Sequence, residues 1–140
     1  MDRRTFLGGM LPVLAAPSYL YRNSNAEVEG IKSLLDAFKT QQSNVMLENV
    51  AGTVEKLLPD DLEGSRHQRF VIRVSRQQTL LIVHNIDIAP RLNRLREGDR
   101  VTVKGEYEWN ERGGLIHWTH KDPNSTHEDG WIDHLNIRYE

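Results

Sequence analysis

One stretch decides the fold, Val101-Thr102-Val103-Lys104-Gly105-Glu106-Tyr107-Glu108-Trp109, in which apolar or small residues alternate with polar or charged ones. Because successive side chains of a β-strand point to opposite faces, this alternation predicts a strand with one face in the core. Residues 110–114, which include two consecutive glycines, predict a hairpin loop, and residues 115–120 predict the strand that returns beside the first. The protein is therefore expected to be mainly β.

Three further strands are predicted ahead of this hairpin. Residues 45–57 form an extended run that contains Gly52, where a bulge or a sharp bend is expected. Residues 69–74 alternate between apolar and mostly basic side chains, and residues 79–85 are nearly all apolar, as in a well-covered central strand. With the hairpin, these runs make five strands.

Two helices are predicted beside the strands. The first covers residues 29–42, where apolar side chains from Ile31 to Phe38 recur at helical spacing. The second is short and lies between the third and fourth strands, with Asp87 as its cap and Pro90 in its first turn. This order predicts an OB-fold-like domain, a five-stranded Greek-key barrel with an N-terminal amphipathic helix. An SH3-like barrel is the alternative, and the interposed helix argues against it.

The first 26 residues have the three parts of an export signal. Arg3 and Arg4 make a basic start, residues 6–20 are mostly apolar, and small residues end at Ala26. The paired arginines resemble a twin-arginine signal, which a translocase for folded proteins reads. The apolar run is 15 residues long and contains two prolines, whereas roughly 20 apolar residues are needed to span a bilayer.

We therefore predict a cleaved signal over residues 1–26 and a single domain over residues 27–140, with no stable membrane anchor. Cleavage after Ala26 is expected, with cleavage after Ala15 as the alternative. An uncleaved anchor or an N-terminal helix of the domain is the competing interpretation. The predicted location is the periplasm or the medium outside the cell.

Composition excludes several kinds of site. The 140 residues contain no Cys, so a disulfide framework, a thiolate nucleophile and a Cys-ligated metal are ruled out. The signal holds three Arg and one Asp, so of the 18 basic and 20 acidic residues 15 and 19 remain, and the net charge falls from −2 to −4. This charge argues against nonspecific nucleic-acid binding, whose affinity comes mostly from phosphate neutralisation. A single-strand groove of arginines and aromatic rings is kept as an alternative.

Histidines gather in the second half of the chain, and four of the six lie within residues 117–134. The motifs are G-S-R-H-Q-R-F at 64–70, H-N-I-D-I-A-P at 84–90, G-E-Y-E-W at 105–109 and H-W-T-H-K-D-P at 117–123, followed by His127 and G-W-I at 130–132. Together they resemble an uncharacterised bacterial family, domain of unknown function 3465, over about residues 44–134. The resemblance implies a small exported protein and no assigned activity. It marks these recurring polar positions: His67, His84, Asn85, His117, Thr119, His120, Asp122 and His127.

These residue types have a metal-binding interpretation. Neutral imidazoles and a carboxylate are preferred ligands of Zn²⁺ and other transition metals. The predicted metal site consists of His117, His120, Asp122 and His127. On a regular strand residues 117 and 120 point to opposite faces, so the site requires the strand to end or bulge near Thr119.

Two other interpretations compete with the metal. The histidines make structural hydrogen bonds that tie the C-terminal loop to the rest of the fold, because a buried imidazole must satisfy both nitrogens. Alternatively, a histidine works with Asp122 or Asp87 as an acid–base pair on a bound ligand.

Two function classes follow. The first is a noncatalytic binding or accessory module for an unknown ligand or protein partner. Its candidate ligand-binding residues are His67, His84, Asn85, Trp118 and Thr119. The second is a small hydrolase, acting on phosphodiesters, that uses Zn²⁺ or another divalent metal. The first is preferred because OB domains are mostly binders and the sequence identifies no nucleophile. Whether the protein is an enzyme stays open.

Overall fold

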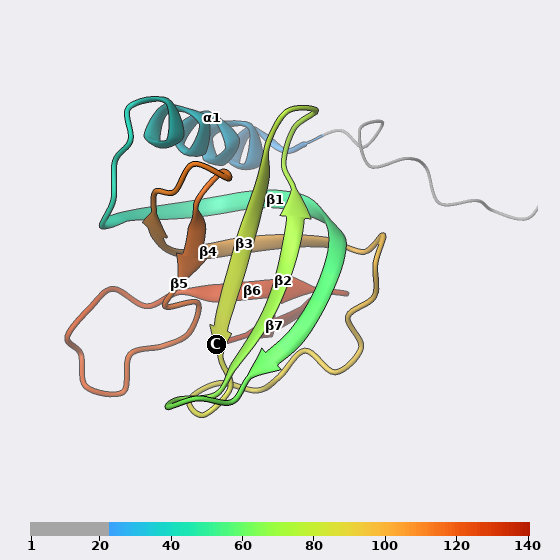
Figure 1. The fold of residues 1–140 in the computed structure, drawn as a ribbon, viewed down its shortest axis with the longest axis vertical. Coiled ribbons are helices and arrows are strands. Elements are labelled where there is room, and N and C mark those ends of the chain that lie inside the picture. Colours follow the sequence, from blue (N-terminus) through green and yellow to red (C-terminus); the bar gives the residue numbers. More distant parts are fainter. Residues whose placement is uncertain (1–22) are drawn as a thin grey trace, which may run out of the picture.

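The computed structural model describes residues 23–140, so the predicted signal lies outside the described residues except for positions 23–26. One helix and seven strands in a single sheet make up this part of the chain (Figure 1). The elements are α1 (Asn25–Lys39), β1 (Val45–Asp61), β2 (His67–Arg73), β3 (Thr79–Asn85), β4 (Arg100–Glu108), β5 (Leu115–His117), β6 (Trp131–His134) and β7 (Ile137–Tyr139). The prediction of a mainly β protein is confirmed.

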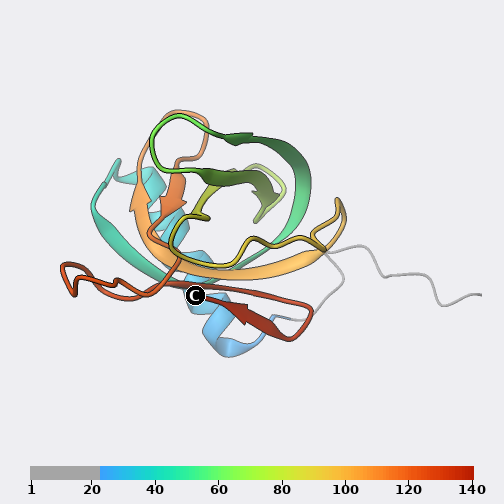
Figure 2. The same ribbon diagram turned by 90° about the horizontal axis from the view of Figure 1, so that it is seen from below.

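β1 is long enough to serve two neighbours. Its first half pairs with β4, from Val45 opposite Tyr107 to Thr53 opposite Arg100, and its second half pairs with β2. The strand order β1-β2-β3-β5-β4 therefore returns to β1, and β6 and β7 continue from β4. Figure 2 shows the sheet curling round as this circuit requires. Only β3 and β5 run parallel among the described pairings.

The core fills the inside of this circuit. Alternate residues of β2, β3 and β4 are buried, so the period of two seen in the sequence is realised in each of them. The side chains with no exposed surface include Phe70, Ile72, Ile82, Val103, Tyr107 and Ile116. None of the helical segments in the described part of the chain is long and apolar enough to span a bilayer.

The register shifts of β1 do not fall at Gly52, where a bulge or a sharp bend was predicted. They lie between Leu47 and Val50 against β4, and between Val54 and Lys56 and between Leu58 and Asp61 against β2. Gly52 has another use, because an added Cβ there would lie 2.8 Å from the carbonyl oxygen of Arg73 on β2. The glycine thus permits close approach of two strands rather than marking the bulge.

α1 begins four residues before its predicted start. The Ser24 hydroxyl accepts the Glu27 N–H at 3.2 Å, and the Glu27 carboxylate accepts the Ser24 N–H at 3.1 Å. This reciprocal pair is a capping box, which fixes the first turn. The helix packs against β1 (Figure 1), and an added Cβ at Gly30 would collide with the carbonyl oxygens of Glu48 and Asn49.

The second predicted helix, between β3 and β4, is wrong. Residues 86–99 form turns and irregular structure. Two of their backbone donors go to side chains, the Asp87 N–H to Asn85 Oδ1 at 2.9 Å and the Leu92 N–H to the buried Gln68 Oε1 at 2.9 Å. The Ala89 N–H makes one helical i→i−4 bond, to the Asn85 carbonyl oxygen at 3.1 Å. Pro90 has no N–H to give. The helical pattern does not continue beyond this turn, because the donors that it would need next are missing or go to local and tertiary partners.

Two strands, β6 and β7, were not predicted, and β6 shapes the site. β5 pairs with residues 106–108 of β4, and β6 pairs with residues 101–104 on the same edge. The chain between them, residues 118–130, leaves the sheet and returns to the edge it left. We call this segment the excursion loop. It carries most of the predicted site residues.

Candidate functional site

Two glycines allow the ends of the excursion loop to lie close against the sheet. An added Cβ at Gly105 of β4 would collide with the His117 carbonyl oxygen, and one at Gly130 would collide with that of Trp118. β5 ends at His117, and Trp118 has a φ of 55°, in the left-handed region. The condition set for residues 117 and 120 to share a site, a strand that ends near Thr119, is therefore met.

The loop and the ends of β2 and β3 enclose a cavity of about 270 Å³. Seven of the nine predicted site residues line it: His67, Asn85, His117, Trp118, His120, Asp122 and His127. The other two, His84 and Thr119, are buried and in contact with each other. Residues spread over 61 positions are thus brought to one place, which we call the histidine cavity.

The His84 ring is held at both nitrogens. Nε2 lies 2.9 Å from the Pro90 carbonyl oxygen and Nδ1 lies 2.7 Å from Thr119 Oγ1. A carbonyl only accepts, so Nε2 carries the proton and Nδ1 accepts from the Thr119 hydroxyl. Burial lowers the pKa of His84 to about 4, against the weaker effect of these hydrogen bonds. The ring is therefore neutral at pH 7 and links β3 to the excursion loop.

Three histidine rings of the cavity are each oriented by a hydrogen bond between Nδ1 and a nearby backbone carbonyl. Nδ1 of His67, His120 and His127 lies 2.7–2.8 Å from the carbonyl oxygen of Ser65, Lys121 and Glu128 respectively. Each Nδ1 must donate its hydrogen there, so the Nε2 of each neutral ring keeps a lone pair. A fixed tautomer of this kind is typical of histidines that accept from a ligand or bind a metal.

Aromatic contacts fix the same rings further. Trp118 stacks on His127 with centroids 4.0 Å apart and planes 5° from parallel, and it lies 5.1 Å from the His117 ring. His120 meets the edge of His127 at 5.7 Å. The left-handed backbone of Trp118 is the strained feature that this packing maintains.

Asp122 organises the loop. Oδ1 accepts the Asn124 N–H at 2.9 Å, and Oδ2 accepts the His127 N–H, the Thr126 N–H and the Thr126 hydroxyl. Desolvation raises the pKa of Asp122, but these four hydrogen bonds together lower it far below its usual range. Nε2 of His127 lies 3.8 Å from Oδ2. Both oxygens are committed to the loop, which leaves little capacity for a metal.

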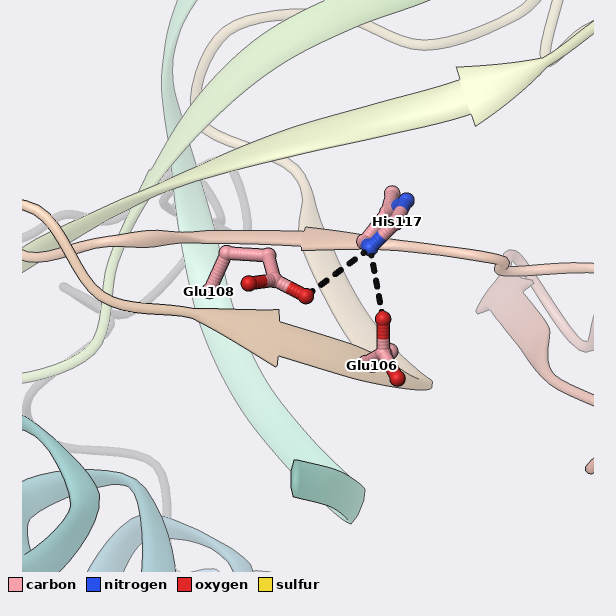
Figure 3. Close-up of side chains that lie close together, drawn as sticks. All are labelled: Glu106, Glu108 and His117. Carbon is pink, nitrogen blue, oxygen red and sulfur yellow. Dashed lines mark hydrogen bonds and ion pairs between the residues drawn. The ribbon is translucent and has the colours of Figure 1, made fainter. Parts of the chain in front are cut away.

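The predicted four-residue metal set is not assembled as a cluster. Within residues 23–140, a single group of three His, Asp or Glu has ligand atoms that all lie within 4.8 Å of one another, and it consists of Glu106, Glu108 and His117 (Figure 3). His117 belonged to the predicted set, whereas the two glutamates did not. Nε2 of His117 lies 3.0 Å from Glu106 Oε1 and 3.4 Å from Glu108 Oε2.

The pKa of Glu106 depends on its neighbours. Burial raises the pKa of Glu106, the adjacent Glu108 raises it further, and His117 opposes both. Sequence reasoning missed this pair because Glu106 and Glu108 alternate with core residues like any solvent face. The available signal was their i, i+2 spacing opposite a histidine-bearing strand.

Two other predictions, the acid–base pair and the single-strand groove, depend on charged residues that already have partners in the fold. Asp87, the alternative acid–base residue, binds Arg66 with Nε 2.6 Å from Oδ1. Arginines of the suggested single-strand groove also have protein partners: Arg66 with Asp87, Arg69 with the Pro59 carbonyl, Arg73 with Glu55 and Arg91 with Asp60. Three of these four charges are therefore balanced by a carboxylate of the fold.

Comparison with known protein families assigns most of the chain. A family model described as "Protein of unknown function (DUF3465)" matches residues 18–140. No curated protein matches the chain. The family resemblance found in the sequence motifs is therefore confirmed.

Proposed function

Since the chain belongs to the DUF3465 family, described as of unknown function, we propose from its site that it is an exported, noncatalytic binding module. Its ligand is a small polar molecule held in the histidine cavity. The preset Nε2 acceptors of His67, His120 and His127 carry this proposal, and they favour a ligand that presents hydroxyl or amine hydrogens.

The strand circuit supports an OB-fold assignment. Five strands in the order β1-β2-β3-β5-β4, with β1 pairing β4 and β3 parallel to β5, fit a closed five-stranded Greek-key barrel. OB domains bind their ligands on one barrel face and its connecting loops. Here the excursion loop follows β5 and lies over the ends of β2 and β3, where the cavity is found.

Pre-organisation supports binding as the use of this cavity. A ligand binds more tightly when its contacts need no ordering on association. His127 is fixed by Glu128 on one side and by Trp118 on its face, and His120 is 2% exposed. Asp122 holds the loop between them. Side chains fixed in this way can bind a ligand without any catalytic group.

The hydrolase alternative has less support from the same residues. It needs at least three convergent metal ligands and an open position. Asp122 already accepts four hydrogen bonds, and within residues 23–140 no three ligand atoms of the predicted set lie within 4.8 Å of one another. We therefore keep binding as the proposal.

Native mass spectrometry tests the binding proposal. The protein is purified without chelator and exposed to the small-molecule fraction of a periplasmic extract. We expect a bound mass in the wild type that is lost in His67→Ala and His127→Ala, because each removes a preset acceptor. Asn136→Ala, which lines a different cavity, is the matched control and should keep it. A bare wild-type mass under these conditions contradicts the proposal.

Export is tested separately. Lys replacement of Arg3 and Arg4 should leave precursor in the cytoplasm, and unchanged periplasmic accumulation would refute the twin-arginine assignment. The capping box adds a proposal about the cleavage site. Loss of Ser24 would cost about 1 kcal/mol of helix stability, so cleavage after Ala15 preserves the domain better than cleavage after Ala26. The intact mass of the exported protein distinguishes the two.

A further inference from the structure

We propose that Glu106, Glu108 and His117 form a binding site for a first-row divalent cation, with Zn²⁺ as the type. The site lies where β4 pairs with β5, and Figure 3 shows the three side chains converging there. It is distinct from the histidine cavity, although His117 also lines that cavity. It does not depend on the ligand proposed for the cavity.

The spacing of the three side chains fits a metal. Metal bonds of about 2.0–2.1 Å at tetrahedral or octahedral angles place neighbouring ligand atoms roughly 2.9–3.4 Å apart. Nε2 of His117 lies 3.0 Å from Glu106 Oε1 and 3.4 Å from Glu108 Oε2. A cation can therefore replace the Nε2 hydrogen with little movement of the three ligands, and the ring then carries its proton on Nδ1.

Strand register creates this arrangement. Glu106 is directly opposite His117 in the antiparallel pair, and Glu108 follows on the same face of β4. All three ligands thus stand on paired strands rather than on a loop, which favours a fixed geometry. Asn44 donates its Nδ2 hydrogen to Glu108 Oε2 at 2.9 Å, the kind of outer contact that orients a ligating carboxylate.

Charge and burial point the same way. Two carboxylates face one imidazole, and the glutamate side chains are 13% and 29% exposed, so the repulsion between the carboxylates is only partly screened. Lys104, which precedes them on the same strand face, is paired with Glu128 at 2.7 Å. A divalent cation would balance the two carboxylates, and three protein ligands leave at least one position open for water.

The donor set selects the metal class. Mg²⁺ and Ca²⁺ prefer oxygen ligands throughout, whereas imidazole suits Zn²⁺ and other first-row transition ions. One imidazole with two carboxylates should therefore bind Zn²⁺ more tightly than Mg²⁺.

Isothermal titration calorimetry with Zn²⁺ alone tests the site. The full-length protein is first freed of metal with a chelator, which is then removed. We expect one Zn²⁺ per protein, with the dissociation constant raised more than about 100-fold in Glu106→Gln and in Glu108→Gln, since even an outer contact is worth 10- to 100-fold. Glu111→Gln, an exposed carboxylate of the same hairpin, is the matched control and should bind as the wild type does.

His127→Ala separates this site from the cavity. It should leave Zn²⁺ binding unchanged even if it abolishes the ligand of the histidine cavity. Wild-type Zn²⁺ affinity in both glutamine variants would overturn the proposal, as would loss of binding in His127→Ala alone or a wild-type dissociation constant weaker than about 1 mM. Circular dichroism of each variant confirms that the fold is kept, and two independent glutamine variants guard against misfolding of one.

Discussion

Two cavities of the molecule differ in the hydrogen-bonding capacity of the side chains that line them. The wider one, about 490 Å³, lies beside β6 and β7 and is lined by Arg100, Asp133, His134 and Arg138 among others. Its charged groups are matched within the protein: Arg138 binds both oxygens of Asp133 at 2.8 and 2.9 Å and lies over the Trp131 ring. The smaller histidine cavity, about 270 Å³, instead has three imidazole nitrogens kept as acceptors. This difference in preset hydrogen-bonding capacity, rather than in volume, is the reason for proposing the smaller cavity as the binding site.

Each cavity has a buried histidine next to it, and these two residues differ in the same way. His84 pairs both nitrogens with neutral groups that belong to separate segments. His134 pairs Nε2 with Asp99 Oδ2 at 2.7 Å, while its buried Nδ1 has no hydrogen-bond partner within the described residues. His84 therefore joins three segments under a site, whereas His134 ties one strand to one turn.

The largest expected effect comes from exchanging each buried histidine for Leu. His84→Leu leaves the Thr119 hydroxyl and the Pro90 carbonyl without their partner, and we expect a loss of about 3 kcal/mol. His134→Leu removes an unpaired nitrogen, and Asp99 Oδ2 still accepts the Arg96 N–H, so we expect a change within about 1 kcal/mol. Urea unfolding measures both, and equal losses would remove the contrast between the two regions.

The second effect is a pH dependence that comes from His84, beside the histidine cavity. The pKa of His84 is about 4 in the folded protein and 6.5 in its ordinary state, because burial disfavours the charged ring. The unfolded chain therefore takes up the proton first as the pH falls. The contribution to stability is full above pH 6.5 and is lost between pH 6.5 and 4.

Between pH 7.5 and 5 this loss amounts to about 2 kcal/mol. His84→Leu cannot titrate at this position, so its stability should fall less than that of the wild type by that amount. Unfolding curves at the two pH values give the difference. Parallel curves for both proteins would show that folding does not lower the pKa of His84, contrary to its burial.

The sequence predicted what depends on local pattern. The strands realised as β1 to β5 follow from alternation or from extended apolar runs, and each was expected within a few residues of its observed bounds. β6 and β7 were missed because runs of four and three residues are too short for a period to be recognised. The helix at 86–99 was wrong because Gln68, 24 positions away from Leu92, takes a donor that helix formation requires.

The site divides in the same way. Its residue types were recognisable as a concentration of histidines, and the structure gathers them round one cavity. Their partners were not recognisable, because Thr119 reaches His84 over 35 positions through the parallel pairing of β3 and β5. Glu106 and Glu108 became visible only when the register placed Glu106 opposite His117. The local sequence shows which chemical groups are present. The sheet topology decides which of these groups become neighbours, and that could not be predicted from the local sequence.

The smallest effect separates backbone strain from ring packing at the mouth of the histidine cavity. Trp118 has a left-handed φ of 55°, which costs a residue with a Cβ about 1–2 kcal/mol, and its ring stacks on His127. Trp118→Ala and Trp118→Gly both lose the stack, but only glycine adopts this backbone without penalty. We therefore expect the glycine variant to be more stable than the alanine variant by about 1 kcal/mol in urea unfolding. The reverse order would mean that packing alone holds the excursion loop at this point. At Leu135, a left-handed residue beside the wider cavity, the same pair of substitutions should give the same order. That result would make the strain a property of the turn, and only the stack on His127 would then distinguish the histidine cavity.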